Sequence, residues 1–402
     1  MDTSDTSNNV DEIRRRAASL EAEYGVRLPQ LSIGGGTGRI LVLSFKCDAP
    51  VMISTSDFFL YTDELASLKV VDDSTVRTAR IRQTAIDYTN GYYDEIHFHD
   101  SFVGENFTVS VVKHPILIGC VNNKDEWTKG TRGGPCSSVN AIEFRYNSVD
   151  DVLSPEQEDD IIQGVLFAIS DKYNRPFAVG LRDVRKYIYR IELKLPSEKF
   201  RFVDNNVASL PHYSPMFDFY TQALQVKNDD IKFLYFYKVI EYISPIVAKI
   251  KAHEELCRKL PSGIPATGNV GYLDSIFSLT RTHDKSIKDS ELAKTVMEQC
   301  DIVKLYEFLP GWVRKRCPKE TKARKQQHAI GMTAEKERAI KNKVAAILYA
   351  TRNSIVHAKA NYEPTGDECP QEDLFQLNIF MRKLCKDLIF WKEKHPGVTL
   401  KK

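Results

Sequence analysis

The hydrophobic pattern of this chain changes its period once, near residues 210–215, and this change is the strongest constraint on its fold. Before it, short runs rich in β-branched and aromatic residues are fully apolar or alternate with polar ones, as in β-strands. These runs are GRILVLSFK, TARIRQTAIDY, EIHFHDSF, NFTVSVV, PILIGCV, NAIEFRY and YIYRIELKL. After it, apolar residues recur every three or four positions, which is the helical period. The pattern therefore predicts two domains, 31–210 and 211–402.

In the first domain, the predicted strands follow one another, with one predicted helix, Pro155 to Lys172, before the last strand. Turn sequences such as TNGYY, TRGGP and VGEN separate the strands. Strands and helices do not alternate as they would in a doubly wound nucleotide-binding fold. The order predicts an α+β domain with a largely antiparallel sheet, to which we assign a sensor or regulatory role.

Residues 1–30 are polar at first and then show one short charged helix, Asp11 to Tyr24, without an apolar stripe wide enough to anchor a core. We expect a separate leader that is mobile or contacts a partner. The start of the chain is unlike a signal peptide, and no run of about 18 uncharged apolar residues follows. The expectation is a cytoplasmic protein without membrane contact.

The second domain is expected to be an all-helical bundle of four or five helices. Its first strong helix carries residues at helical spacing, namely Phe233, Phe236, Tyr237, Ile240, Ser244 and Val247. Pro245 lies within this helix, where it removes a backbone donor, kinks the helix and frees the carbonyl oxygen of Glu241. Further helices are predicted at Asp289–Leu309, Ala334–Lys359 and Gln371–Lys394, with a loop at 261–271.

Positive charge is concentrated in a basic insert, residues 310–343. Its stretch 314–343 has 11 Lys and Arg against 3 Glu, a net +8, while the whole chain has only +2, so the rest sums to −6. A polyanion such as RNA would be drawn to this insert, although many charge runs are only solvated faces. The candidate RNA-binding residues are Arg314, Lys315, Arg316, Lys322, Arg324, Lys325, Lys336, Arg338 and Lys341.

The helix that follows the insert ends in the sequence TRNSIVHAK, which places Arg352, Asn353 and His357 in its last two turns. An Arg four to six residues before a His is expected about once by chance in a chain of this size. The context adds weight, because the helix has two apolar stripes. One faces the domain core and consists of Ile340, Val344, Ile347, Leu348, Thr351 and Ile355.

The second stripe, made of Ala345, Tyr349 and Val356, lies on roughly the opposite side of this helix. Arg352 borders it on one flank, and Asn353 and His357 on the other. A surface helix needs only one apolar stripe, so the second predicts a further contact. A two-fold homodimer would bring two Arg and two His into one cleft, but a neighbouring helix of the same chain could also cover the stripe.

The pattern RNxxxH on this helix resembles the Rx4-6H signature of the HEPN superfamily, the higher eukaryotes and prokaryotes nucleotide-binding domain. The stretch FLYFYKVIEYISPI resembles the opening helix of its ApeA-like branch. The resemblance covers about residues 215–395 and no motif of the first 210. It implies metal-independent cleavage of RNA at a composite dimer site and a role in bacterial antiphage defence, with a regulatory partner or phage-derived trigger.

The residue types suit this chemistry. An imidazole can take the proton of a ribose 2′-hydroxyl, so His357 is the candidate general base. Arg352 can hold the non-bridging phosphate oxygens as charge develops, and Asn353 can orient His357 or the phosphate. Glu241 is a secondary candidate. No metal or cofactor is expected, and DNA is excluded because it lacks the 2′-hydroxyl.

Each candidate also has a structural explanation. His357 can be a surface residue at a helix C-terminus, and Arg352 or Glu241 an ordinary ion-pair partner. At the level of function, the alternatives are a non-catalytic HEPN module that binds RNA, a nucleotide or a partner protein, and a dimerisation scaffold.

Three other patterns are weaker. Glu95, His97 and His99 share a predicted strand and could together bind a metal ion, although such groups of residues often hold no metal. The run IGGGTGR, residues 33–39, has no GK[ST] and precedes a strand, so it fails as a phosphate-binding loop. The eight cysteines are scattered without a CxxC pair and predict reduced thiols.

Overall fold

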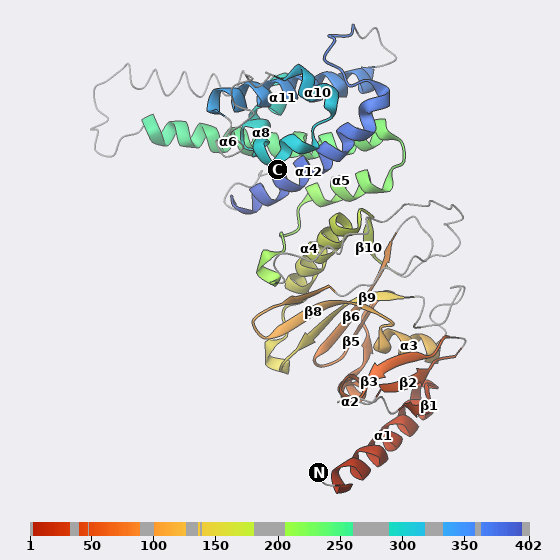
Figure 1. Cartoon of the computed structure of the whole chain (residues 1–402). Coiled ribbons are helices and arrows are strands. Elements are labelled where there is room, and N and C mark those ends of the chain that lie inside the picture. The colour runs from red at the N-terminus through yellow and green to blue at the C-terminus, as the bar shows by residue number, and fades with distance from the viewer. Residues whose placement is uncertain are drawn as a thin grey trace, which may run out of the picture. The chain divides into compact units, whose positions relative to one another are not determined.

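The computed structural model describes residues 3–32, 40–46, 48–88, 100–125, 136, 139–180, 206–259, 289–317, 333–357 and 363–395. The chain divides into two compact units, unit 1 from Met1 to Tyr213 and unit 2 from Ser214 to Lys402 (Figure 1). Unit 1 contains two antiparallel sheets with helices, and the described elements of unit 2 are all helical. The predicted fold class, an α+β domain followed by a helical domain, is confirmed.

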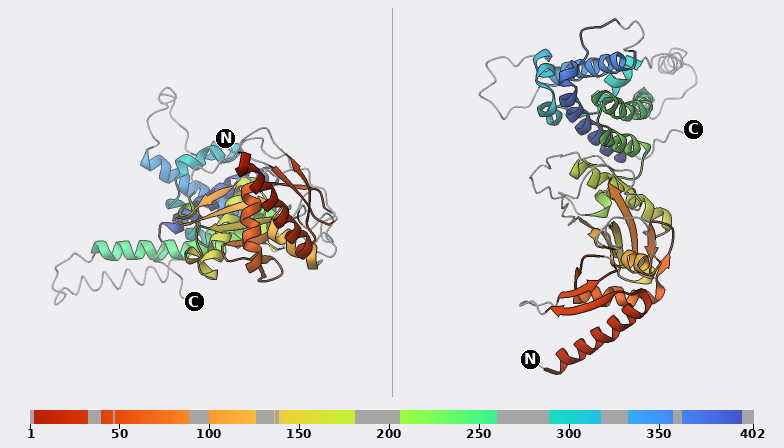
Figure 2. Two further views of the ribbon diagram at one scale, coloured as in Figure 1. Left: turned by 90° about the horizontal axis from the view of Figure 1, so that it is seen from below. Right: turned by 90° about the vertical axis from the view of Figure 1, so that its right-hand side faces the viewer.

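Unit 1 begins with helix α1 (Thr3–Tyr24) and a three-stranded sheet of β1 (Arg27–Ser32), β2 (Ile40–Ser44) and β3 (Val51–Ser54). The expectation of a separate leader is wrong. Ile13, Leu20 and Tyr24 of α1 are buried in the same hydrophobic cluster as the strands. The sequence did not reveal this burial, because Ile13, Leu20 and Tyr24 are spaced among charged residues. Figure 2 shows α1 beside the three-stranded sheet.

The second sheet of unit 1 has the strand order β4-β5-β6-β9-β8-β7, with β10 also paired to β6. Its strands are β4 (Lys69–Val70), β5 (Thr75–Arg77), β6 (Ile81–Tyr88), β7 (Ser101–Val103), β8 (Phe107–Lys113), β9 (Asn140–Tyr146) and β10 (Phe177–Val179). Every pair of neighbouring strands is antiparallel. The central strand β9 is buried on both faces, because Ala141 and Ile142 belong to different hydrophobic clusters.

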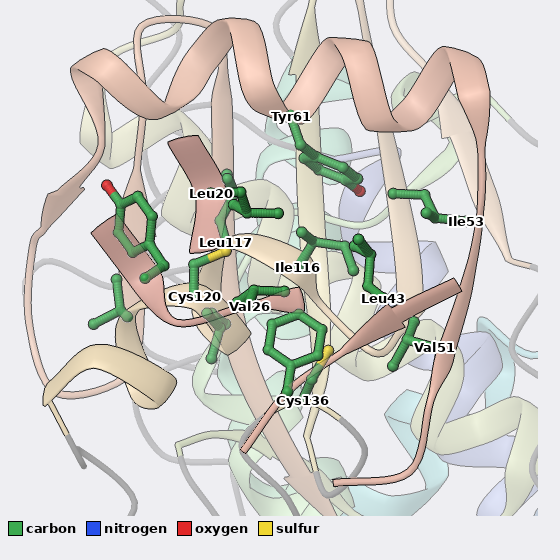
Figure 3. Close-up of a cluster of buried hydrophobic side chains, with 14 of the residues drawn as sticks. Leu20, Val26, Leu43, Val51, Ile53, Tyr61, Ile116, Leu117, Cys120 and Cys136 are labelled. Atoms are coloured by element: carbon green, nitrogen blue, oxygen red, sulfur yellow. The ribbon is translucent and has the colours of Figure 1, made fainter. Parts of the chain in front are cut away.

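Helices cover both faces of this sheet. On one face, α2 (Thr55–Glu64) and α3 (Ile116–Asp125) join the cluster shown in Figure 3, in which Tyr61, Ile116 and Leu117 meet strand residues. On the other, α4 (Pro155–Tyr173) packs Ile162, Val165 and neighbouring residues against the strands.

Helix α3 corrects one prediction, since PILIGCV was expected to be a strand. Gly119 donates its backbone N–H to the carbonyl of Pro115, four residues back, which is the helical hydrogen bond. The side chains of Leu117, Ile118 and Cys120 are all fully buried. A helix buried on every side has no amphipathic period, so its sequence cannot be distinguished from that of a buried strand.

Two buried carboxylates fix helices to opposite faces of the second sheet. Glu143 accepts hydrogen bonds from Tyr61 of α2 at 2.8 Å and from Gln83 of β6, and its other oxygen lies 2.5 Å from the Arg145 guanidinium. Glu158 of α4 is fully buried; its oxygens lie 2.8 Å from Arg77 and 2.7 Å from Arg82. Because both carboxylates are paired, their burial is tolerated.

Gly164 lies in the middle of α4, and we expect that even its replacement by alanine destabilises unit 1. A Cβ there would lie 2.9 Å from the carbonyl oxygen of Pro211, which is backbone and cannot easily move away. We expect Gly164→Ala to lower the free energy of unfolding by about 1–3 kcal/mol. Gly311→Ala is the matched control, because its Cβ would meet no atom within 4 Å. Equal denaturation midpoints of the two variants would contradict this prediction.

Unit 2 is built around α5 (Pro215–Gln225), α6 (Asp229–Lys259) and α12 (Leu374–Glu393), with α8 (Asp289–Glu298) and α11 (Ala334–His357) packed on them. The single helix predicted over Asp289–Leu309 is wrong. It is broken into α8 and the short α9 (Ile302–Leu305), with Asp301 capping the second helix through the N–H of Lys304. The helix α10 (Gly311–Arg316) follows.

No helix in the described ranges is long and apolar enough to cross a membrane. Six of the eight cysteines, Cys120, Cys136, Cys300, Cys317, Cys369 and Cys385, are free thiols, and all of these except Cys369 are buried. Burial raises the pKa of Cys369 to about 12, since a thiolate is poorly solvated there.

Candidate active site

Helix α11 presents the motif because its opposite side is anchored in the core of unit 2. Ile340, Val344, Ile347, Leu348 and Thr351 are buried, as the core stripe predicts, and Ile355 is half-buried. The Thr351 hydroxyl donates to the carbonyl of Ile347 at 2.7 Å and accepts the backbone N–H of Cys369 at 2.9 Å. This second bond ties the segment 363–370 to the last turns of α11.

Arg352 makes two polar contacts at the surface of unit 2. Its Nη1 donates to the Oδ1 of Asn353 at 3.1 Å, and its Nη2 donates to the Oε1 of Glu241 at 3.2 Å. The side chains of Arg352 and Glu241 are 25% and 41% exposed, so solvent screens this ion pair and it contributes little stability. The structure therefore brings together Arg352, Asn353 and Glu241.

Glu241 reaches this place from α6, 111 residues earlier in the chain. Its backbone carbonyl has no helical donor, because position 245 is proline. The hydroxyl of Ser244 supplies the missing hydrogen bond at 3.0 Å. The backbone carbonyl of Glu241 is thus hydrogen-bonded even though Pro245 cannot donate to it.

His357 is the last residue of α11 and is exposed. Within the described ranges it makes no hydrogen bond or ion pair, so the structure does not bring it into contact with Arg352. The two residues are separated by five positions, which turns them to different sides of the helix. An exposed imidazole one turn beyond Asn353 is open to a ligand from solvent.

The second apolar stripe of α11 is covered in part by its own chain. Ala345 is buried, Tyr349 is half-buried and Val356 is 47% exposed. Helix α8 packs on α11, and its residues Glu291 and Lys294 line the same pocket as Ala345 and Tyr349. The alternative of a neighbouring helix therefore holds for the beginning of the stripe, and only its end, beside His357, faces outward.

A pocket of about 460 Å³ opens beside the motif. Asn342, Ala346, Tyr349 and Asn353 of α11 line it. Its rim holds polar groups of α8 and of the segment 363–370, namely Glu291, Lys294, Thr365 and Asp367. Its volume lies within the range of small-molecule sites, roughly 300–1,000 Å³.

The segment TGDE, residues 365–368, holds the rim of this pocket in place. Glu368 accepts the backbone N–H groups of Thr365 at 2.7 Å and Gly366 at 2.8 Å. Gly366 has φ +81°, a conformation that favours glycine. Asp367 pairs with Lys343 at 2.6 Å. The sequence assigned no site role to this segment or to α8, and the turn residues Thr-Gly-Asp were the signal that could have marked the segment.

The basic insert is less uniform than its charge suggests. Arg314, Lys315 and Arg338 are exposed, whereas Lys341 is 12% exposed and pairs with Glu337 at 2.7 Å, so Lys341 is not available as an RNA contact. Arg316 is exposed but donates to the carbonyl of Gly366 at 2.7 Å. Lys336 is half-buried, and Lys322, Arg324 and Lys325 lie outside the described residues.

Two further sequence candidates also lie outside the described residues: the set Glu95, His97 and His99, and the glycine-rich run 33–39. Within the ranges that the structure describes, no group of three or more His, Cys, Asp or Glu is placed to hold a metal ion.

Comparison of the chain with models of protein families, with curated proteins and with solved structures gives no match.

Proposed function

We propose that unit 2 is a metal-independent endoribonuclease of HEPN type. The observation that carries the proposal is the arrangement at the end of α11, where Arg352 is held by Asn353 and Glu241 and an exposed His357 follows one turn later. A fixed cation and a free imidazole on one helix end are the two groups that 2′-hydroxyl attack requires.

In this mechanism, His357 removes the proton of a ribose 2′-hydroxyl, and the oxygen attacks the adjacent phosphorus. The bond from phosphorus to the 5′-oxygen of the next nucleotide breaks, leaving a 2′,3′-cyclic phosphate and a 5′-hydroxyl that takes up a proton. The Arg352 guanidinium stabilises the charge on the non-bridging oxygens. Arg314, Lys315 and Arg338 would contact phosphates of the bound strand.

The test is incubation of the purified protein with RNA in EDTA, beside the same sequence with a 2′-deoxyribose at every position. We expect cleavage of the RNA in EDTA and none of the DNA, because the nucleophile is absent from DNA. Loss of cleavage in EDTA would exclude the metal-free mechanism. RNA that binds without being cleaved would favour the non-catalytic module.

That second candidate, an HEPN module that binds RNA, a nucleotide or a partner protein, is favoured by one observation. Glu241 already neutralises Arg352 at 3.2 Å, as an ordinary structural ion pair would.

A homodimer is part of the proposal, since the exposed Val356 lies beside His357. If Val356 packs against its counterpart, Val356→Gln weakens dimerisation about tenfold or more, because each Val side chain loses apolar burial. Sedimentation velocity over a concentration series measures this. Val303→Gln, at a valine 50% exposed on α9, is the control. A wild-type protein that is monomeric at micromolar concentration would contradict the composite site.

The cellular role follows from the family resemblance. Uncontrolled RNA cleavage is toxic, so unit 1 would hold unit 2 inactive until it senses a trigger. The resemblance to ApeA-like proteins supports a cytoplasmic role in bacterial antiphage defence, with a regulatory partner or a phage component as the trigger.

A further inference from the structure

We infer that the pocket between α8, α11 and the segment 363–370 binds one base of the RNA substrate and selects a base with an exocyclic amino group. This inference rests on the proposed function, because it assigns to the pocket a nucleotide next to the cleaved phosphate.

The position of the pocket supports the assignment. Asn353 both accepts the hydrogen bond of Arg352 and lines the pocket. His357 follows Asn353 by one helical turn, a rise of about 6 Å. A phosphate held by Arg352 lies next to Asn353, so its nucleotide has its own or the neighbouring base within reach of the pocket.

The lining suits a flat, neutral group. Ala345, Ala346 and Ala350 form a wall of small side chains with the ring of Tyr349 beside it. This combination leaves room for a planar ring and offers an aromatic surface for stacking.

The charged groups at the pocket favour a neutral ligand. Lys294, the cation among the lining residues, pairs with Glu291 at 3.6 Å, and Asp367 pairs with Lys343 at 2.6 Å. A phosphate would have to compete with these carboxylates for their cations, whereas a neutral base would not.

The polar groups favour an amino-bearing base. Carboxylate and amide oxygens accept from adenine N6, cytosine N4 or guanine N2, and asparagine is the usual partner of adenine. Asn342 also lines the pocket, and its Oδ1 is buried and has no hydrogen-bond partner in the described ranges. Uracil has no amino group, and its single ring N–H would satisfy fewer of these acceptors.

The test uses oligonucleotides that contain a single ribose in an otherwise 2′-O-methyl strand, so that only one phosphate can be cleaved. The base on that ribose, and then the base on the next nucleotide, is varied among adenine, cytosine, guanine and uracil. We expect uracil to be cleaved about tenfold or more slowly than the best base at one of the two positions.

Ala346→Leu fills the pocket from an exposed helix position and so leaves the core intact. It should reduce the ratio between bases to about twofold or less. The same substitution at Ala18, exposed on α1, is the matched control and should keep the wild-type ratio. Equal cleavage of all four bases by wild-type protein, or an unchanged ratio in Ala346→Leu, overturns the inference.

A binding measurement separates this inference from the proposed function. If no oligonucleotide is cleaved, the nuclease proposal fails. The affinities of the protein for uncleavable 2′-O-methyl strands then show whether the pocket selects a base. A base preference in binding that Ala346→Leu removes supports the pocket, and its absence overturns it. If AMP or CMP binds the wild-type protein and these strands do not displace it, the pocket binds a free nucleotide. The assignment of the pocket to a base of the RNA substrate is then overturned.

Discussion

Replacing His357 with alanine is expected to lower the rate of RNA cleavage by about 10²–10⁴-fold, the usual contribution of a general base. The exposed imidazole makes no hydrogen bond or ion pair in the described ranges, so its removal should leave the fold unchanged. Single-turnover cleavage at saturating protein measures the chemical step separately from RNA binding. We expect that the rate falls and the affinity for RNA stays nearly the same.

His253→Ala is the matched control, because His253 is also exposed on a helix of unit 2. It should cleave RNA at the wild-type rate. A His357→Ala protein that cleaves as fast as this control would remove His357 from the mechanism. A loss of RNA affinity without a change in the single-turnover rate would make His357 a binding residue instead of a base.

Replacing Glu158 with glutamine is expected to destabilise unit 1 by about 3–5 kcal/mol, which is the usual cost of breaking a buried ion pair. Glu158 is fully buried, and its oxygens lie within 2.8 Å of Arg77 and Arg82. The amide has the shape of the carboxylate but no charge, so within the described ranges Arg77 loses its ion-pair partner and Arg82 keeps only Asp159. The phenol of Tyr146, which donates to Glu158 at 2.5 Å, remains in place.

Chemical denaturation followed by circular dichroism measures this effect, with Glu156→Gln as the control. Glu156 lies two residues earlier on α4 and is exposed, so its substitution should change the free energy of unfolding by less than about 0.5 kcal/mol. If both variants unfold at the same denaturant concentration, the Glu158 ion pairs do not hold α4 to the sheet.

The prediction of elements from the sequence succeeded for the helices α4, α11 and α12, which have one face toward water and a strong helical period. It also succeeded for the strands β6, β8 and β9, which are short runs rich in β-branched and aromatic residues. It failed for α3, whose residues from Ile116 to Asn122 are buried. It predicted the helix Asp11–Tyr24 but missed its burial, because Ile13, Leu20 and Tyr24 are scattered among charged residues. Periodicity reports only a difference between two faces.

The residues of the candidate site also form two groups, those that the sequence predicts to lie together and those that it does not. Arg352, Asn353 and His357 lie within six residues of one helix, so their mutual placement follows from helical geometry. Glu241, Glu291 and Asp367 come from elements far away in the chain, and no spacing in the sequence predicts that they meet. The pocket was missed for this reason.

By itself, the sequence determined the division into a sheet-containing and a helical half, the helix that carries the motif, and the charge of the insert. These follow from local properties, namely the period of apolar residues and the types of side chain. The tertiary structure alone decided that α1 belongs to the core, that Glu241 pairs with Arg352, that Lys341 is taken by Glu337, and that a pocket lies beside Asn353. Such contacts depend on how the chain brings distant segments together, and side chains far apart in sequence carry no local signal of their partners.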